Sequence, residues 1–321
     1  MRIYDGFPFA VEDTPRIVAL GFFDGLHLGH RALIKRLKER ADKLHALATV
    51  FTFADHPDTV FEPEMYFRGL IMSAERRLKT MAELGVDEVV NAPLIPEVYT
   101  MSAKDFFDKQ LRDCLRAKSI VVGRDFRFGH HGQGNVALLK QWCAENAIEL
   151  HVIDDVIVDG EKVSSTRIRT LLRSGKIEEA NRCLGAPYTI GGKVIHGRQL
   201  GRLLGFPTIN VQFDPKMVRP LFGVYASSVL HHGEALPGIT NIGIKPTVDP
   251  DNPLIQSETH IYSEDMDLYD KSVDIQLLAF IREEVKFSSV DALKRQVDRD
   301  KATVLEYHRN KKQELNHGSN L

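Results

Sequence analysis

Short apolar runs alternate with segments of helical periodicity through the first half of the chain. Between most of these runs apolar residues recur every three or four positions, and Ser73 and Ser102 each stand where they would cap a helix. This alternation predicts a doubly wound, mostly parallel α/β sheet with its ligand site at the carboxyl ends of the strands. The strand-like runs are Ile17–Leu20, Ala46–Phe53, Val86–Val90, Ile120–Val122 and Leu150–Ile153.

The pattern changes after Leu184, where strand-like runs punctuated by glycine, proline, asparagine and aspartate dominate. Such a region predicts an antiparallel barrel or sandwich, followed by a helix that begins at Ser288 or Ser289 and frays from about His308. The chain therefore divides into two predicted domains, residues 1–184 and 185–321. The clearest strand-like runs here are Val224–Leu230, Glu258–Tyr262 and Val273–Ile281.

Composition narrows the classes of protein that the chain can be. Its 321 residues are 43% hydrophobic and carry a formal net charge of -2, which gives no reason to expect nucleic acid or an anionic membrane as a partner. The three cysteines form no Cys-x-x-Cys pair, and no leader or long apolar segment is found. We therefore expect an unprocessed cytoplasmic protein, and a weak or transient homo-oligomer stays open.

Residues 21–30 read Gly-Phe-Phe-Asp-Gly-Leu-His-Leu-Gly-His and place His27 and His30 behind the first apolar run. At this spacing both imidazoles fall on one face of the first helical turn, where free backbone N–H groups favour phosphate oxygens. A metal pair and a purely structural role are the alternatives. The position at the carboxyl end of a strand favours a site for the phosphates of a nucleotide.

Polar segments that follow the other strands support a site at the same edge of the sheet. Each alone fits a turn, a solvated surface or a helix cap, but together they gather where a doubly wound sheet binds its ligand. These segments are Thr52–Pro57, Gly123–Gly129 and Ser164–Arg169.

The second domain carries a glycine-rich basic segment, residues 197–210, that ends in Pro-Thr-Ile-Asn. Glycine allows close backbone approach to phosphates and arginine offsets their charge, although an ordinary hairpin has the same composition. Thr208 and Asn210 alternate onto one face of a strand, where both side-chain oxygens suit Mg²⁺.

With these motifs the chain resembles the bacterial bifunctional riboflavin kinase/FAD synthetases. The resemblance implies a Rossmann-like HxGH nucleotidylyltransferase domain, in which His27 and His30 stabilise charge on the α-phosphate of ATP. FMN would attack this phosphate to give FAD and pyrophosphate, which is chemistry that needs positioning and charge neutralisation. The other residues implied are Gly21, Phe23, Asp24, Gly25, Ser165, Thr166 and Arg167 for the nucleotide, and Asp125 and Phe126 for the flavin.

For the second domain the resemblance implies a riboflavin kinase, built as a six-stranded antiparallel β-barrel with a C-terminal helix. Glu258 would be the general base that removes the proton from the 5′-hydroxyl of riboflavin, because an alcohol is a weak nucleophile. Asn241 is implied as a flavin contact, and Thr208 and Asn210 as the Mg²⁺ ligands. The residues implied for ATP are Gly197, Arg198, Arg202 and Gly205.

Among the residues that depart from the pattern of that family, Asp55 stands where proline is typical and Asp270 where glycine is frequent. These departures leave open a flavin-binding regulatory protein that has lost one activity. Within the same fold, the alternative is an enzyme that transfers a cytidylyl or adenylyl group to another phosphate ester. A class I aminoacyl-tRNA synthetase is disfavoured by the neutral charge balance.

Overall fold

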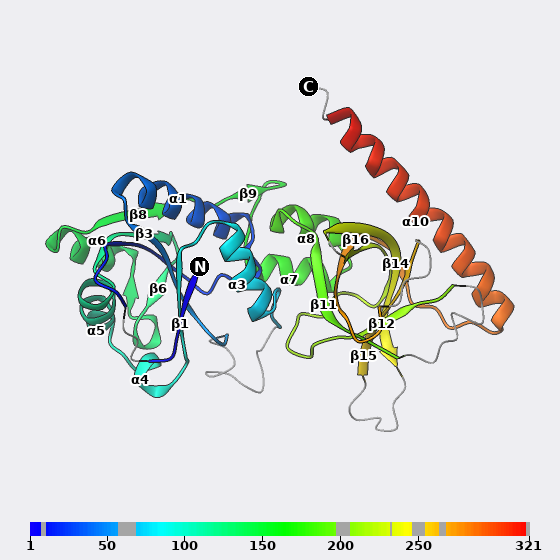
Figure 1. Ribbon diagram of the computed structural model, residues 1–321, viewed down its shortest axis with the longest axis horizontal. Helices are drawn as coiled ribbons and strands as arrows, with labels where there is room; N and C mark the ends of the chain where they lie inside the picture. The colour runs from blue at the N-terminus through cyan, green and yellow to red at the C-terminus, as the bar shows by residue number, and fades with distance from the viewer. Residues whose placement is uncertain are drawn as a thin grey trace. The chain divides into compact units, whose positions relative to one another are not determined.

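A computed structural model describes residues 1–7, 11–56, 69–196, 206–231, 233–245, 254–262 and 268–318 (Figure 1). The chain forms two compact units, Met1–Ser165 and Thr166–Leu321. Within the described residues, every helix is too short or too polar to cross a lipid bilayer. The predicted ATP-binding residues Gly197, Arg198, Arg202 and Gly205 lie outside the described residues.

A six-stranded sheet is the centre of the first unit, with its strands in the order β1-β4-β3-β2-β5-β8. Each neighbouring pair is parallel, which confirms the predicted doubly wound sheet. The strands are β1 (Arg2–Asp5), β2 (Arg16–Leu20), β3 (Leu47–Phe53), β4 (Glu88–Ala92), β5 (Ala117–Gly123) and β8 (Glu149–Ile153).

Helices cover both faces of this sheet, because successive side chains of a buried strand point into two different cores. In β2, Ile17 and Ala19 pack with side chains of α1 and α3, whereas Val18 and Leu20 pack with side chains of η2 and α6. The helical elements are α1 (Leu28–Leu44), α3 (Ala74–Glu83), α4 (Pro96–Tyr99), α5 (Ala103–Asp105), the π-helical segment η2 (Phe106–Cys114) and α6 (Val136–Glu145).

Both predicted helix caps in this unit are confirmed. Ser73 Oγ accepts a hydrogen bond from the backbone N–H of Arg76, and Ser102 Oγ accepts one from that of Asp105. The described part of the unit also contains the short elements η1 (Asp24–Leu26), η3 (His130–Gly132), β6 (Arg127–Phe128), β7 (Gly134–Asn135), β9 (Ile157–Val158) and β10 (Glu161–Lys162).

A closed six-stranded barrel is the centre of the second unit, with its strands in the order β11-β12-β15-β14-β13-β16. All neighbouring pairs are antiparallel, which confirms the predicted barrel. The strands are β11 (Tyr188–Ile195), β12 (Ile209–Gln212), β13 (Gly223–His231), β14 (Glu234–Lys245), β15 (Leu254–Ile261) and β16 (Ser272–Glu283).

Helices accompany the barrel in the second unit: α7 (Ser165–Arg173), α8 (Ile177–Leu184) and α10 (Val290–Gly318). Ser289 Oγ accepts a hydrogen bond from the backbone N–H of Ala292, so Ser289 caps the last helix as one of the two predicted residues. This helix continues past His308, where the sequence predicted fraying.

Candidate active sites

The two histidines of the HxGH motif lie together at the amino end of α1. His27 is the N-cap residue, and its Nδ1 accepts a hydrogen bond of 3.3 Å from the backbone N–H of His30. The two imidazole rings stack with their centroids 3.7 Å apart and their planes 13° from parallel. Because Nδ1 of His27 is an acceptor, its neutral ring carries the proton on Nε2.

Gly29 lies between the two histidines, and steric crowding explains why a glycine occupies this position. A Cβ atom at Gly29 would lie 3.2 Å from Cε1 and Nδ1 of the His27 ring, which is tighter than ordinary van der Waals contact. A Cβ atom at Gly29 would therefore require the His27 ring to shift by a few tenths of an ångström.

The surroundings of His30 disfavour its charged form. Burial, the neighbouring His27 and the guanidinium of Arg77 lower the pKa of His30 well below its ordinary value. The buried Nδ1 of His30 has no hydrogen-bond partner among the described residues. The imidazole is therefore neutral, and an anionic ligand bound beside it would raise its pKa and favour uptake of a proton from solvent.

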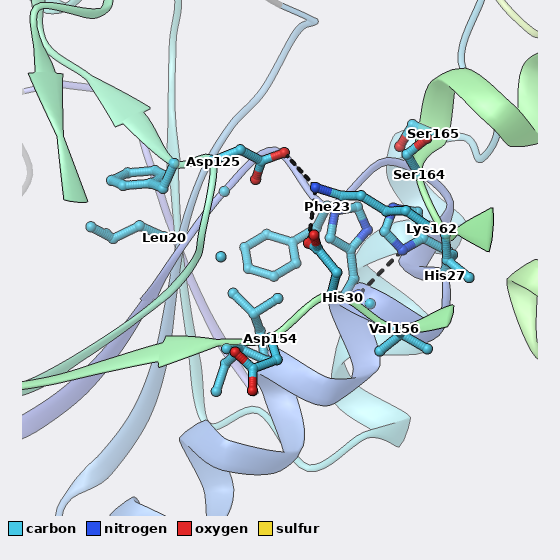
Figure 2. Close-up of a pocket in the computed structure, with 18 residues that line it drawn as sticks. Leu20, Phe23, His27, His30, Asp125, Asp154, Val156, Lys162, Ser164 and Ser165 are labelled. Atoms are coloured by element: carbon cyan, nitrogen blue, oxygen red, sulfur yellow. Dashed lines mark hydrogen bonds and ion pairs between the residues drawn. The ribbon is translucent and has the colours of Figure 1, made fainter. Parts of the chain in front are cut away.

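A cavity of about 260 Å³ opens beside the two histidines (Figure 2). Lys162 Nζ, which lines this cavity, lies 3.0 Å from Asp125 Oδ2 and 2.9 Å from Asp155 Oδ1. The hydrogen bond from Lys162 lowers the pKa of Asp125, so this carboxylate stays ionised. Two imidazoles and an ammonium group line this cavity, and we name it the phosphate pocket after the ligand expected from the sequence.

Lys162 was missed by the sequence analysis. A single lysine in a short hairpin has the pattern of an exposed residue, and only its position two residues before Ser164 could have indicated a role. Figure 2 shows its side chain directed at Asp125 on the side of the cavity where the histidines lie.

A second cavity of about 610 Å³ adjoins the first and is lined mainly by aromatic and aliphatic side chains. Asp125 and Phe126 line both cavities, and the Phe126 ring stacks on Phe128 with centroids 5.6 Å apart. We name this cavity the aromatic pocket. Its other lining rings and aliphatic side chains are Phe22, Phe51, Phe53, Leu94, Val98, Tyr99, Met101 and Phe106.

The predicted nucleotide-binding residues occupy different positions. Gly21, Phe23 and Ser165 line the phosphate pocket, whereas Asp24 and Gly25 are buried in the loop before α1. The carboxylate of Asp24 accepts hydrogen bonds from the backbone N–H groups of Ile71 and Met72, and Ser165 Oγ donates to the Asp24 carbonyl. Asp24 therefore shapes the loop. The two remaining residues, Thr166 and Arg167, lie in the first turn of α7.

In the barrel, strand register brings three predicted residues into one row. Asn210 on β12 and Asn241 on β14 are both paired with Glu258 on β15. Paired residues of antiparallel strands project to the same side, with Cβ atoms roughly 5 Å apart. The alternate positions Thr240 and Thr259 are fully buried, with their hydroxyls 2.8 Å apart, so the row lies on the opposite, outer face of the barrel.

The end of this row that holds Asn210 fits a divalent cation. Asn210 is 5% exposed, and its buried Oδ1 has no hydrogen-bond partner among the described residues. The unpaired amide oxygen of Asn210, with the hydroxyl of Thr208 two residues before it in the sequence, is the kind of oxygen donor set that Mg²⁺ prefers. Two contacts that the sequence analysis missed frame the row: Asn241 Nδ2 donates to Glu284 Oε1 at 3.0 Å, and the ring of His260 hydrogen-bonds the Pro207 carbonyl.

Known families match both parts of the chain. A family model described as FAD synthetase matches residues 10–167, and one described as riboflavin kinase matches residues 184–308. A crystal structure of a protein named as a macrolide-efflux protein from Streptococcus pneumoniae has a TM-score of 0.83 and 29% identity, covering 92% of this chain and 95% of that one.

Two curated relatives extend the similarity over nearly the whole chain. A bifunctional riboflavin kinase/FMN adenylyltransferase from Pseudomonas fluorescens is 36% identical, over 90% of this chain and 91% of the relative. One of the same name from Escherichia coli K12 is 37% identical, over 91% of this chain and 92% of the relative. The chain therefore belongs to the family of bifunctional riboflavin kinase/FMN adenylyltransferases, the enzymes that make FAD.

Proposed function

We propose that the two activities of the family are divided between the two units. The domain built on the parallel sheet, with predicted bounds 1–184, joins FMN to the adenylyl group of ATP. The barrel domain, with predicted bounds 185–321, phosphorylates riboflavin with ATP. The separate matches of the two family models to residues 10–167 and 184–308 support this order along the chain.

The observation that carries the first assignment is the pair of stacked imidazoles in the phosphate pocket. The stacked rings of His27 and His30 line the cavity that Lys162 and Ser165 also line. These groups would neutralise charge on the α-phosphate of ATP and on the outgoing phosphates. Lys162 would exchange its present carboxylate partners for phosphate oxygens.

The reaction at this site forms one bond and breaks one. A phosphate oxygen of FMN attacks the α-phosphorus of ATP, and the bond from that phosphorus to the oxygen bridging to the β-phosphate breaks. Pyrophosphate leaves with that oxygen and with the electron pair of the broken bond. No side chain needs to act as a nucleophile, so the residues contribute positioning and charge neutralisation.

The aromatic pocket supports a place for the isoalloxazine ring of FMN. Its volume of about 610 Å³ falls in the range of small-ligand sites, and phenylalanine rings line it. Because Asp125 and Phe126 line both cavities, a flavin bound here would direct its ribityl phosphate toward the histidines.

In the barrel, we assign Glu258 as the general base for the 5′-hydroxyl of riboflavin. Its carboxylate is exposed on the outer face between Asn210 and Asn241, which leaves room for a substrate beside it. Thr208 and Asn210 would hold Mg²⁺, which offsets negative charge on the phosphates of ATP when it is bound. Asn241, held by Glu284, would contact the flavin.

The compartment and the binding partners of the enzyme are also part of this proposal. We propose a cytoplasmic enzyme whose partners are riboflavin, FMN and ATP, without nucleic acid. The net charge of -2 and the absence of Cys-x-x-Cys pairs in the sequence support these points.

Two variants of the full-length protein test the division of activities. His27→Ala should still convert riboflavin to FMN but lose FAD formation, because the adenylyl site lacks its charge-neutralising imidazole. Glu258→Gln should lower the kinase rate about 10²- to 10⁴-fold, the usual cost of losing a general base, while added FMN is still converted to FAD. Chromatography of the flavins after incubation with ATP and Mg²⁺ measures both.

Matched controls replace a histidine and a glutamate that lie away from the two sites. His45→Asn alters the histidine at the other end of α1, where φ is 48° and asparagine is well tolerated. Glu234→Gln alters an exposed carboxylate at the start of β14. Both should retain both activities. Loss of both activities in either site variant, or CTP replacing ATP in the wild-type reaction, would contradict the proposal.

A further inference from the structure

The loop between β2 and α1 has an unfavourable backbone conformation. Phe23 has φ of 60° and Leu26 has φ of 42°, in the left-handed region that non-glycine residues rarely adopt, and Gly25 lies between them with φ of 80°. Such conformations persist only where surrounding contacts impose them. This loop ends at His27, so whatever holds it also sets the position of the imidazoles.

Arg77 on α3 supplies a buried charged contact to this loop. Its Nη1 donates to the Phe22 carbonyl at 3.1 Å, and its Nη2 donates to the Phe53 carbonyl at 2.7 Å. Thr52 Oγ1 donates to the same Phe22 carbonyl at 3.0 Å. The start of the loop is thereby tied to the end of β3 at two points.

Burying this guanidinium is costly, which indicates a role beyond filling space. Arg77 is 3% exposed, its guanidinium carbon lies 4.6 Å from the centroid of the Phe22 ring, and its Nε has no partner among the described residues. Burial lowers its pKa, and the carboxylates of Asp24 and Asp55 oppose that effect. Asp55, the departure from the family pattern, is therefore one of the carboxylates that balance the charge of Arg77.

We propose that Arg77 is a positioning residue for adenylyl transfer, which holds the strained loop so that His27 and His30 stay directed at the phosphate pocket. The inference rests on the proposed function of that pocket. Arg77 lines neither cavity, so it acts through the Phe22 carbonyl and does not touch the substrate.

The test compares Arg77→Lys and Arg77→Gln in the full-length enzyme with Lys79→Gln, which removes an exposed charge from the same helix. Lysine keeps the charge but reaches only one of the two carbonyls. Both Arg77 variants should lower kcat for FAD formation from FMN about 10- to 100-fold with KM for ATP changed less, because misplaced catalytic groups slow the chemical step. Riboflavin kinase activity should stay unchanged, which checks the barrel, and circular dichroism checks separately that the unit containing Arg77 is folded.

A second pair of variants gives an independent test if an Arg77 variant fails to fold. Thr52→Val removes the other hydrogen bond to the Phe22 carbonyl and should lower the same kcat, whereas Thr52→Ser keeps the hydroxyl and should restore it. In ¹H–¹³C spectra, the ring signals of His27 and His30 should shift in Arg77→Gln and Thr52→Val but not in Lys79→Gln or Thr52→Ser.

Two outcomes overturn this inference: FAD formation within twofold of the wild type in a folded Arg77→Gln variant, or equal values of kcat for Thr52→Val and Thr52→Ser. His27→Ala separates the role of the pocket from the role of Arg77. If that variant still forms FAD, the proposed function of the pocket fails. If it loses FAD formation while the folded Arg77 variants retain it, only the positioning role of Arg77 fails.

Discussion

The protonation state of His30 is set by its neighbours. Desolvation is the largest effect that lowers its pKa, followed by the proximity of His27 and Arg77. Since the folded protein then binds fewer protons at this site than the unfolded chain, the free energy of unfolding falls as the pH drops below about 6.5 toward the folded pKa. At neutral pH the free enzyme therefore presents an uncharged imidazole.

Titration of labelled histidines tests this state directly. In protein carrying ¹³C-histidine, the His30 signal can be assigned with His30→Asn. We expect this signal to titrate with a pKa below the ordinary histidine pKa of about 6.5. A non-hydrolysable ATP analogue should raise the midpoint, because negative phosphates favour the charged ring. A midpoint at or above the ordinary value without nucleotide would refute the burial argument.

Motifs in the sequence point to the side chains proposed to contact ligands, but give little sign of the residues that position them. His27 and His30 stand in a motif whose spacing alone brings them to one helical turn, whereas Glu258 is implied only by the resemblance to the family. Arg77 has the pattern of an ordinary charged position on an amphipathic helix, because its burial depends on carbonyl groups from two other elements. Glu284 follows its strand without any motif, and only the folded register brings it to Asn241.

Among the elements, strands with continuous apolar runs could be predicted from the sequence. Strands whose place depends on pairing with a neighbouring strand could not. The runs that became β2, β3, β5 and β8 are bounded clearly in the sequence, whereas β1 is mostly exposed and owes its place to pairing with β4. The π-helical segment η2 has the same apolar spacing as an α-helix, so its winding could not be predicted from the pattern.

The last helix, α10, is attached to the barrel by an ion pair and a small apolar cluster. Arg282 Nη2 on β16 lies 2.7 Å from Asp300 Oδ2, and Asp300 is 4% exposed. One turn further along, the fully buried Val304 packs with Ala226 and Ala279. Removing either contact should therefore loosen the helix from its strands.

Val304→Ala tests the apolar half of this attachment. Loss of two buried methyl groups should lower the free energy of unfolding of the barrel by about 2 kcal/mol. The matched control Leu305→Ala changes a 40% exposed neighbour and should cost less than about 0.5 kcal/mol. Loss of riboflavin kinase activity in denaturant measures the unfolding of the barrel alone. A readout confined to the barrel is needed because the two units need not unfold together. Equal losses for both variants would contradict the packing argument.

At the scale of the whole molecule, the chain joins two sites whose chemistry is consecutive. The residues proposed for the barrel site and those of the phosphate pocket each come from one compact unit. Riboflavin phosphorylation yields FMN, which is the acceptor for adenylyl transfer. Because the two sets of residues come from different compact units, we expect the two steps to be separable between molecules.

Mixing two variants that each lack a different activity tests this separability. His27→Ala should make FMN without FAD, and Glu258→Gln should convert FMN to FAD without making FMN. Together they should form FAD from riboflavin after a lag that shortens as the concentration of the His27→Ala variant rises, since FMN must first accumulate in solution. Chromatography of timed samples measures the lag, with each variant alone as the control. If the mixture accumulates FMN but no FAD, while Glu258→Gln still converts added FMN, the FMN stays bound to the barrel that formed it and the two steps are coupled within one molecule.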